Sequence, residues 1–205
     1  SLHDALPIYL TFSDAALIAR DICMKHNRDG SIFTSRVLKS ALEQFGFSSI
    51  VPMSVRVLIF NPYVTNEFKI NKSPSKKRLN ALLNHPRGHS VALGFEESNG
   101  NDWKGHLVLI AKNSEGTWLI DATLIQANRP EHKIWMLPIG VKVADGFGTF
   151  DGSRAIVKLN DSSVIYSSFP SDKSYEHVED WHSTNEEFDA VNVSNQIFER
   201  FIEGS

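Results

Sequence analysis

Two stretches near the start of the chain repeat apolar residues at the spacing of an amphipathic helix. In residues 29–47 (DGSIFTSRVLKSALEQFGF) the apolar positions recur every three or four residues, which places them on one face of a helix. Gly46 is suited to end this helix, because glycine accepts the left-handed conformation just after the last helical residue. A Ser-Asp pair begins a similar run, which predicts an earlier helix over residues 13–26.

Short hydrophobic runs separated by polar turns follow the helices. Residues 50–60 (IVPMSVRVLIF) predict a largely buried strand. Residues 61–87 are polar and contain three prolines, which predicts an irregular excursion with a short helix at residues 77–83. Further strands are predicted at residues 90–95, 106–111, 117–121, 133–138, 154–159 and 164–168. The turn cluster at residues 112–116 predicts a hairpin between two of them.

The last part of the chain is acidic from Ser174 and then becomes apolar again. Phe188, Val191, Ile197, Phe198 and Phe201 predict a closing amphipathic helix. Helices first and an antiparallel sheet afterwards define the α+β class. We expect a single domain over residues 1–205, with its core at about 13–168 and an acidic segment and helix at 174–203.

Composition narrows the possible partners. The chain has 205 residues, of which 41% are hydrophobic and 22% charged, with a net charge of -3. This balance disfavours a dedicated nucleic-acid binder, and no apolar run is long enough to span a bilayer, so neither nucleic acid nor membrane is an expected partner. Cys23 is the single cysteine, which excludes an internal disulfide and a cysteine-based zinc site and agrees with a cytoplasmic location.

His106 begins one strand of the predicted hairpin and Asp121 ends the other. Antiparallel pairing across a tight connection brings both residues to the same end of the hairpin. A carboxylate beside an imidazole fixes its tautomer and stabilises the imidazolium, which makes His106 a candidate general base. The alternative is a surface histidine and a turn aspartate that meet by accident.

Ser31 begins the second helix, where it is either an N-cap or occupies the position of a nucleophile. Backbone N–H groups and the helix dipole lower the pKa of a thiol at such a position and stabilise an oxyanion. Cys23 is the rival nucleophile. It lies within the first helix between Ile22 and Met24, where a small buried side chain is the expected role.

Three segments together resemble a group of bacterial transglutaminase-like proteins, in the superfamily of the papain-like cysteine proteases. They are SIFTSRVLKSALEQFGF…VPMSVRVLIFNP, WKGHLVLIA and WLIDATLIQANRPE, and they cover about residues 30–138. In that group the helix begins Cys-Ile-x-x-Thr-Arg-Val, the histidine lies in Gly-His-Leu-Val, and the aspartate begins Asp-x-Thr/Ser-x-x-Gln-x-x-Arg-Pro. The resemblance implies a papain-like α+β fold and thiol-based acyl transfer, with no cofactor.

Carried over to this chain, the resemblance makes His106 the base, Asp121 its orienting partner and Ser31 the residue at the nucleophile position. Serine stands where the group has cysteine, and two explanations remain open. The serine is an engineered Cys→Ser replacement in an enzyme, or it is natural in a slow serine acyltransferase or a pseudoenzyme. The substrate would be a peptide, a protein or a small amide or ester, cleaved by water or transferred to an amine. A pseudoenzyme would bind a peptide or protein partner in the same cleft. The oligomeric state stays open.

Other residues near these motifs are secondary candidates. Gln126 and Ile32 are candidates for substrate binding or for the oxyanion site, and Trp103 is a candidate wall of the cleft. Structural roles in a loop or in the core are the alternatives for them. Arg129 either pairs with a nearby carboxylate or meets an anionic substrate group.

A metal site is the remaining possibility considered for the histidines. His85 and His89 flank a Pro-Arg-Gly turn, and with His106 they give three candidate ligands. No HExxH pattern or tight His-x-His spacing accompanies them, so no metal is expected.

Overall fold

The computed structural model describes residues 12–25, 30–44, 47–70, 74–96, 102–182, 191–196 and 199. The helices are α2 (Phe12–Lys25), α3 (Ser31–Gln44), α4 (Pro62–Ile70) and α5 (Lys76–Leu83), with 3-10 helices η1 (Leu124–Ala127), η2 (Pro130–His132), η3 (Ser174–His177) and η4 (Glu179–Trp181). The strands are β1 (Ile50–Phe60), β2 (Ser90–Leu93), β3 (His106–Asn113), β4 (Gly116–Asp121), β5 (Ile139–Val143), β6 (Arg154–Leu159) and β7 (Ser162–Phe169). The fold is mixed α+β.

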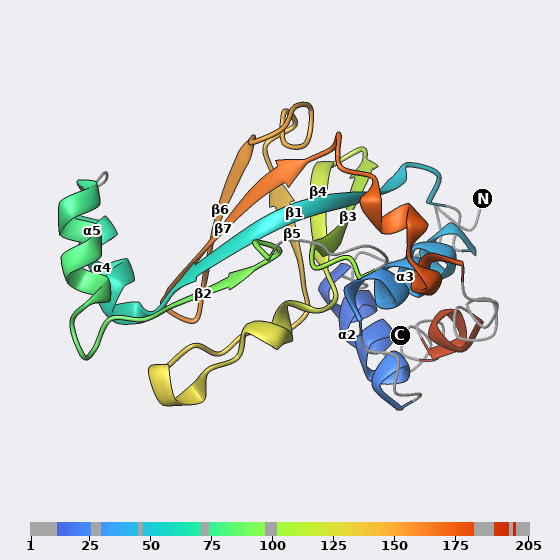
Figure 1. Cartoon of the computed structure of the whole chain (residues 1–205). Coiled ribbons are helices and arrows are strands. Elements are labelled where there is room, and N and C mark those ends of the chain that lie inside the picture. The colour runs from blue at the N-terminus through green and yellow to red at the C-terminus, as the bar shows by residue number, and fades with distance from the viewer. Residues whose placement is uncertain are drawn as a thin grey trace.

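The strands form one antiparallel sheet in the order β5-β4-β3-β1-β7-β6. β1 is the long central strand, and it runs from the helical layer at one end to the α4–α5 pair at the other (Figure 1). β3 pairs with residues 50–55 of β1, and β2 pairs with residues 57–60 along the same edge. Along this edge the partner of β1 therefore changes from β3 to β2 near the middle of β1, next to His106, the first residue of β3.

Both faces of the central strands are buried. Leu109, Ala111 and Ile120 face α2 and α3 and form one hydrophobic cluster with them. The intervening positions, among them Val108 and Ile110, join a second cluster on the opposite face. Burial on both faces explains why β3 is a nearly continuous hydrophobic run rather than an alternating one.

Most of the elements expected from the hydrophobic pattern are confirmed. α2, α3, β1, β2, β3, β4, β6 and β7 all lie within a few residues of their predicted ranges. The hairpin at residues 112–116 is confirmed by the pairing of Lys112 with Thr117. None of the helices described is both long enough and apolar enough to cross a membrane.

The prediction that residues 61–87 are irregular apart from one short helix is wrong, because α4 also forms there. Asn61 caps α4, since its Oδ1 accepts a hydrogen bond from the N–H of Val64 at 3.2 Å. Pro62 occupies the first helical position, where its fixed φ and missing N–H are tolerated. The Asn-Pro pair was therefore a helix start rather than a break.

The strand predicted at residues 133–138 is also wrong. This segment makes only an isolated bridge between Arg129 and Ile134, and Lys133 adopts a left-handed φ of 61° at the end of η2. The strand that pairs with β4 is β5, which starts just after Pro138. Pro138 has no N–H to donate to a ladder, which explains why pairing begins only beyond it.

Two further predictions, the end of α3 and the closing helix, fall partly outside the described residues. Gly46, Phe188, Ile197, Phe198 and Phe201 lie outside the described residues. Residues 191–196 are helical, but Val191 is exposed and Val193 is the residue that packs into the cluster with α2 and α3. The predicted buried face of the closing helix is therefore wrong at Val191.

Candidate functional site

A buried His106–Asp121 pair lies at the end of the β3–β4 hairpin. The Nε2 atom of His106 is 2.9 Å from Oδ2 of Asp121, and the two side chains are 2% and 0% exposed. Leu109 pairs with Ile120, so His106 and Asp121 lie diagonally opposite on one face of the two strands. Because an ionised carboxylate only accepts hydrogen bonds, the ring proton belongs on Nε2, which leaves Nδ1 as a base.

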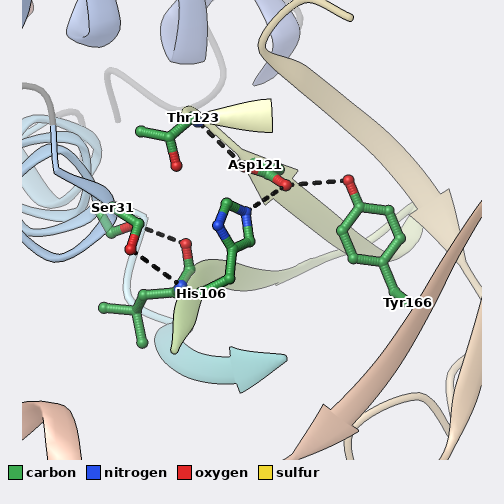
Figure 2. A network of polar contacts seen from close by, with 7 residues as sticks. Ser31, His106, Asp121, Thr123 and Tyr166 are labelled. Atoms are coloured by element: carbon green, nitrogen blue, oxygen red, sulfur yellow. Dashed lines mark hydrogen bonds and ion pairs between the residues drawn. The ribbon is translucent and has the colours of Figure 1, made fainter. Parts of the chain in front are cut away.

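Asp121 accepts hydrogen bonds from two further donors. The Tyr166 hydroxyl donates to Oδ2 at 3.0 Å, and the backbone N–H of Thr123 donates to Oδ1 at 3.0 Å (Figure 2). Together with His106, these donors occupy both carboxylate oxygens and fix the orientation of the carboxylate. A buried charge without such partners would be costly, so the network accounts for the burial of Asp121.

Tyr166 is the member of this network that sequence reasoning missed. Burial raises the pKa of its hydroxyl well above the ordinary value, and the neighbouring charge of Asp121 raises it further. The hydroxyl therefore stays protonated and continues to donate at any pH near neutrality. Tyr166 lies on β7, on the far side of β1 from β3, and no local spacing in the sequence connects it with Asp121.

Ser31 lies at the first turn of α3, against the first residues of β3. Its Oγ accepts a hydrogen bond from the N–H of Leu107 at 3.3 Å. One turn later, the Ser35 hydroxyl donates to the carbonyl of Leu107 at 3.3 Å. These two contacts fix the start of α3 on the residue that follows His106.

The three residues predicted to form a triad therefore come from neighbouring elements. His106 contacts Asp121, whereas the hydrogen bond of Ser31 is to Leu107. Figure 2 shows the imidazole of His106 with one nitrogen toward Asp121 and the other on the side of Ser31. The Oγ of Ser31 is bonded to the backbone of Leu107 rather than to the imidazole. The arrangement has a base and its orienting partner in contact, and a hydroxyl beside them.

The start of α3 also supplies candidate oxyanion donors. The first intrahelical hydrogen bond runs from the N–H of Thr34 to the carbonyl of Gly30 at 3.1 Å, so the N–H of Ile32 precedes it. The Ile32 side chain is buried against Leu107 and Tyr175. Ile32 is therefore placed to act through its backbone, while its side chain anchors the helix.

Trp103 is half-buried and lines a pocket of about 530 Å³. Its ring lies edge-on to Tyr175, with the centroids 5.8 Å apart, and it covers Gly105, where any Cβ would overlap the ring. Ser54, Arg56 and Asp172 line the same pocket. Trp103 is thus a wall of a pocket beside the residue that precedes His106.

The remaining candidates lie outside the network around Asp121. Gln126 is exposed on η1, and its carbonyl accepts from the guanidinium of Arg129 at 3.2 Å. Arg129 also donates to the carbonyl of Asn128 at 2.6 Å, which is a structural role in this turn. Cys23 is 0% exposed and packs in the core of the helical layer, as a structural cysteine does.

Among the described residues, His85 and His89 have aromatic neighbours of their own and do not join His106. His85 stacks on Tyr63, with centroids 4.8 Å apart, and His89 stacks on His132 at 3.5 Å. Burial lowers the pKa of His89, and the neighbouring His132 and Arg129 lower it further. Over the part of the chain that the structure describes, no three His, Cys, Asp or Glu side chains are grouped to hold a metal ion.

Comparison of the chain with protein-family models, with curated proteins and with solved structures gives no match.

Proposed function

We propose that this chain has a papain-like or transglutaminase-like fold and that its site is built for acyl transfer through a nucleophile at position 31. The observation that carries the proposal is the buried His106–Asp121 pair next to the start of α3. An oriented imidazole, an adjacent helix start and a short side chain at that start are the parts that nucleophilic acyl chemistry requires.

In the proposed reaction, the nucleophile at position 31 loses its proton to Nδ1 of His106 and attacks the carbonyl carbon of an amide, ester or thioester. N–H groups at the start of α3 receive the oxyanion. The tetrahedral intermediate then collapses, and the leaving group takes the proton from His106. Water or an amine finally attacks the acyl group, with His106 again accepting a proton, and restores the nucleophile. Asp121 holds the ring throughout and stabilises the imidazolium.

Serine at position 31 makes this chain the slow or silent form of that chemistry. A hydroxyl ionises far less readily than a thiol, and an imidazole suited to a thiolate compensates little for the difference. The hydrogen bond that Ser31 accepts from Leu107 favours a second candidate function. In that function the chain is a natural pseudoenzyme that binds a peptide or protein partner in the same cleft.

The test places sulfur at position 31. The Ser31→Cys variant is mixed with p-nitrophenyl acetate, and the released p-nitrophenolate and the mass of the protein are measured together. We expect a burst of about one equivalent and a single acetyl group on residue 31, since acyl-enzyme accumulation gives such a burst. The parent chain, with Ser31 and buried Cys23, is the blank.

Matched controls distinguish the effect of His106 on the reactivity of the thiol from the effect of the helix start. Ser75 is an exposed N-cap of α5, so Ser75→Cys places a thiol at another helix start. We expect Ser75→Cys and the double variant Ser31→Cys/His106→Ala to acylate much more slowly than Ser31→Cys. Equal acylation of Ser31→Cys and Ser75→Cys would contradict the enzymatic proposal and leave the binding function.

A further inference from the structure

The pocket behind Trp103 adjoins the candidate site through the backbone. Gly94 adopts a φ of +74°, and a Cβ there would lie 3.0 Å from the N–H nitrogen of His106. Gly105, the residue before His106, lines the pocket with Gly94. On the adjacent β1, Ser54 lines the pocket and pairs with Leu107, the residue whose N–H binds Ser31. The pocket therefore adjoins the proposed site through the backbone of Gly105 and Leu107, and the side chains of Ser54 and Arg56 extend from the face of β1 opposite to that of Val55, which pairs with His106.

Arg56 is the cation among the described residues that line this pocket. Its guanidinium carbon lies 4.6 Å from the ring centroid of Phe169 and 5.6 Å from that of Phe95. The guanidinium of Arg56 makes these two ring contacts. Among the described residues it takes part in no ion pair. Aromatic contacts hold a guanidinium in place and leave the donors on its edge available.

The acidic residues of the pocket do not neutralise Arg56. Burial alone would raise the pKa of Asp172, but hydrogen bonds from Ser174, Ser54 and Trp103 outweigh it and lower the pKa. Asp172 accepts from the Ser54 hydroxyl at 2.9 Å and from the Ser174 hydroxyl at 2.6 Å, so its oxygens are already occupied. Glu96 is exposed at the rim. Two carboxylates in the same pocket repel a dianion such as phosphate more strongly than they repel a single carboxylate.

We propose that this pocket binds a peptide-type acyl donor through a carboxylate that Arg56 recognises, which makes Arg56 the residue that determines specificity. The assignment rests on the function proposed above. A guanidinium pairs with a carboxylate through two parallel hydrogen bonds, and Phe95 and Trp103 provide apolar walls for the stem of the acidic residue. The carboxylate belongs to a Glu or Asp side chain or to the C-terminus of the peptide.

The test measures binding to the parent chain, whose Ser31 is retained. The probes are acetyl-Ala-Glu-Ala-amide, acetyl-Ala-Gln-Ala-amide, acetyl-Ala-Ala-Ala with a free C-terminus, and inorganic phosphate. Titrations are followed by NMR at the Trp103 indole N–H and the Arg56 Nε–H. We expect the Glu peptide to bind at least about ten-fold more tightly than the Gln peptide and to shift both signals. The free C-terminal peptide shows which of the two carboxylate sources is preferred.

Three variants of the chain check the role of Arg56. Arg56→Gln removes the charge and is expected to abolish the difference between the Glu and Gln peptides, whereas Arg56→Lys keeps only part of it because it lacks the planar fork. Glu96→Gln removes a competing charge and is expected to tighten binding of the Glu peptide. Equal affinities of the parent for the Glu and Gln peptides, an unchanged preference in Arg56→Gln, or tighter binding of phosphate than of the Glu peptide would each overturn the proposal.

Failure of this inference is separable from failure of the proposed function. If Ser31→Cys is acylated by p-nitrophenyl acetate but the parent shows no preference for the Glu peptide, the carboxylate site alone is wrong. If the parent prefers the Glu peptide through Arg56 but Ser31→Cys is not acylated, the assignment of the pocket as an acyl-donor site is overturned.

Discussion

At the scale of single residues, the carboxylate of Asp121 is the point at which separate parts of the sheet meet. It accepts from His106 on β3, from Tyr166 on β7 and from the backbone of Thr123 just beyond β4. These contacts occupy both carboxylate oxygens and hold the imidazole with Nε2 toward Asp121. The network therefore links the stability of the sheet to the geometry of the site.

Replacing Tyr166 with Phe removes one of these donors and leaves the ring in place. We expect Tyr166→Phe to lower the free energy of unfolding at pH 7 by about 1.5–3 kcal/mol, because a buried hydrogen bond to a charged acceptor is lost. Urea denaturation of both proteins measures the difference. Tyr63→Phe is a suitable control, since Tyr63 lies on α4, where its ring stacks on His85 rather than joining the network around Asp121.

The same variant has a distinct dependence on pH. The pKa of Tyr166 is raised in the folded protein, so above about pH 10 the unfolded chain releases the proton first. The stability that depends on the protonated hydroxyl is complete below that pH and is lost as the pH rises toward the folded pKa. Between pH 9 and pH 11 the free energy of unfolding, measured by urea denaturation, should therefore fall more steeply for the parent than for Tyr166→Phe. Parallel curves would contradict the pKa argument.

The residues of the site differ in how far sequence could predict them. His106 and Asp121 flank one short hairpin, and a local pairing rule is enough to bring them together. Tyr166 contacts Asp121 only because β7 pairs with β1, which is more than 100 residues away in the chain. Arg56 was hidden for a similar reason, since the two phenylalanines at its guanidinium come from separate segments.

At the scale of elements, Gly94 determines how closely β2 approaches the start of β3. Its φ of +74° disfavours any residue with a Cβ, and such a Cβ would lie 2.6 Å from the carbonyl oxygen of Val55. Gly152 has a similar φ of +84° but nothing within 4 Å of the added carbon. The two glycines thus share the conformation and differ in the crowding around them.

This difference gives a paired prediction. Gly152→Ala should lose about 1–2 kcal/mol of unfolding free energy from the left-handed conformation alone. Gly94→Ala should lose clearly more, because the contacts with Val55 and His106 must also be relieved. Guanidinium denaturation of the two variants measures the comparison. Equal losses would show that the backbone at Gly94 relaxes without disturbing the start of β3.

Elements with strong periodicity were predictable, and those that depend on a cap or on an edge were less so. α3 and β1 follow their hydrophobic patterns closely. α4 was missed because its start depends on one asparagine side chain and on a proline that is usually interpreted as a break. β5 was misplaced because β4 pairs with the residues that follow Pro138, and the hydrophobic pattern does not show where that pairing begins.

At the scale of the whole molecule, the helical layer and the sheet share a continuous core. α2 packs on β4 and β5, α3 packs on β1 and β3, and Cys23 lies inside this layer with no exposed surface. The α+β class follows from the order of the elements along the chain. The strand order does not, because it depends on long-range pairings that local patterns leave open.

Cys23 offers a measurement of how this layer opens. In the parent chain we expect Ellman's reagent to modify Cys23 far more slowly than a free thiol under native conditions, since the side chain is fully buried. The rate should rise with urea in parallel with the loss of circular dichroism. Ser75→Cys, with its exposed thiol, should be modified at once. Native Cys23 reacting as fast as that control would contradict the packing of α2.

If position 31 is a nucleophile's position with His106 as its base, a thiol placed there must ionise at an unusually low pH. Alkylation of Ser31→Cys by iodoacetamide is followed from pH 5 to pH 9, beside Ser75→Cys and Ser31→Cys/His106→Gln. We expect Ser31→Cys to react at pH 6 at least about ten-fold faster than both, because its thiol is held as a thiolate. A profile that matches Ser75→Cys, with its midpoint near the ordinary thiol pKa of about 8.5, would contradict it.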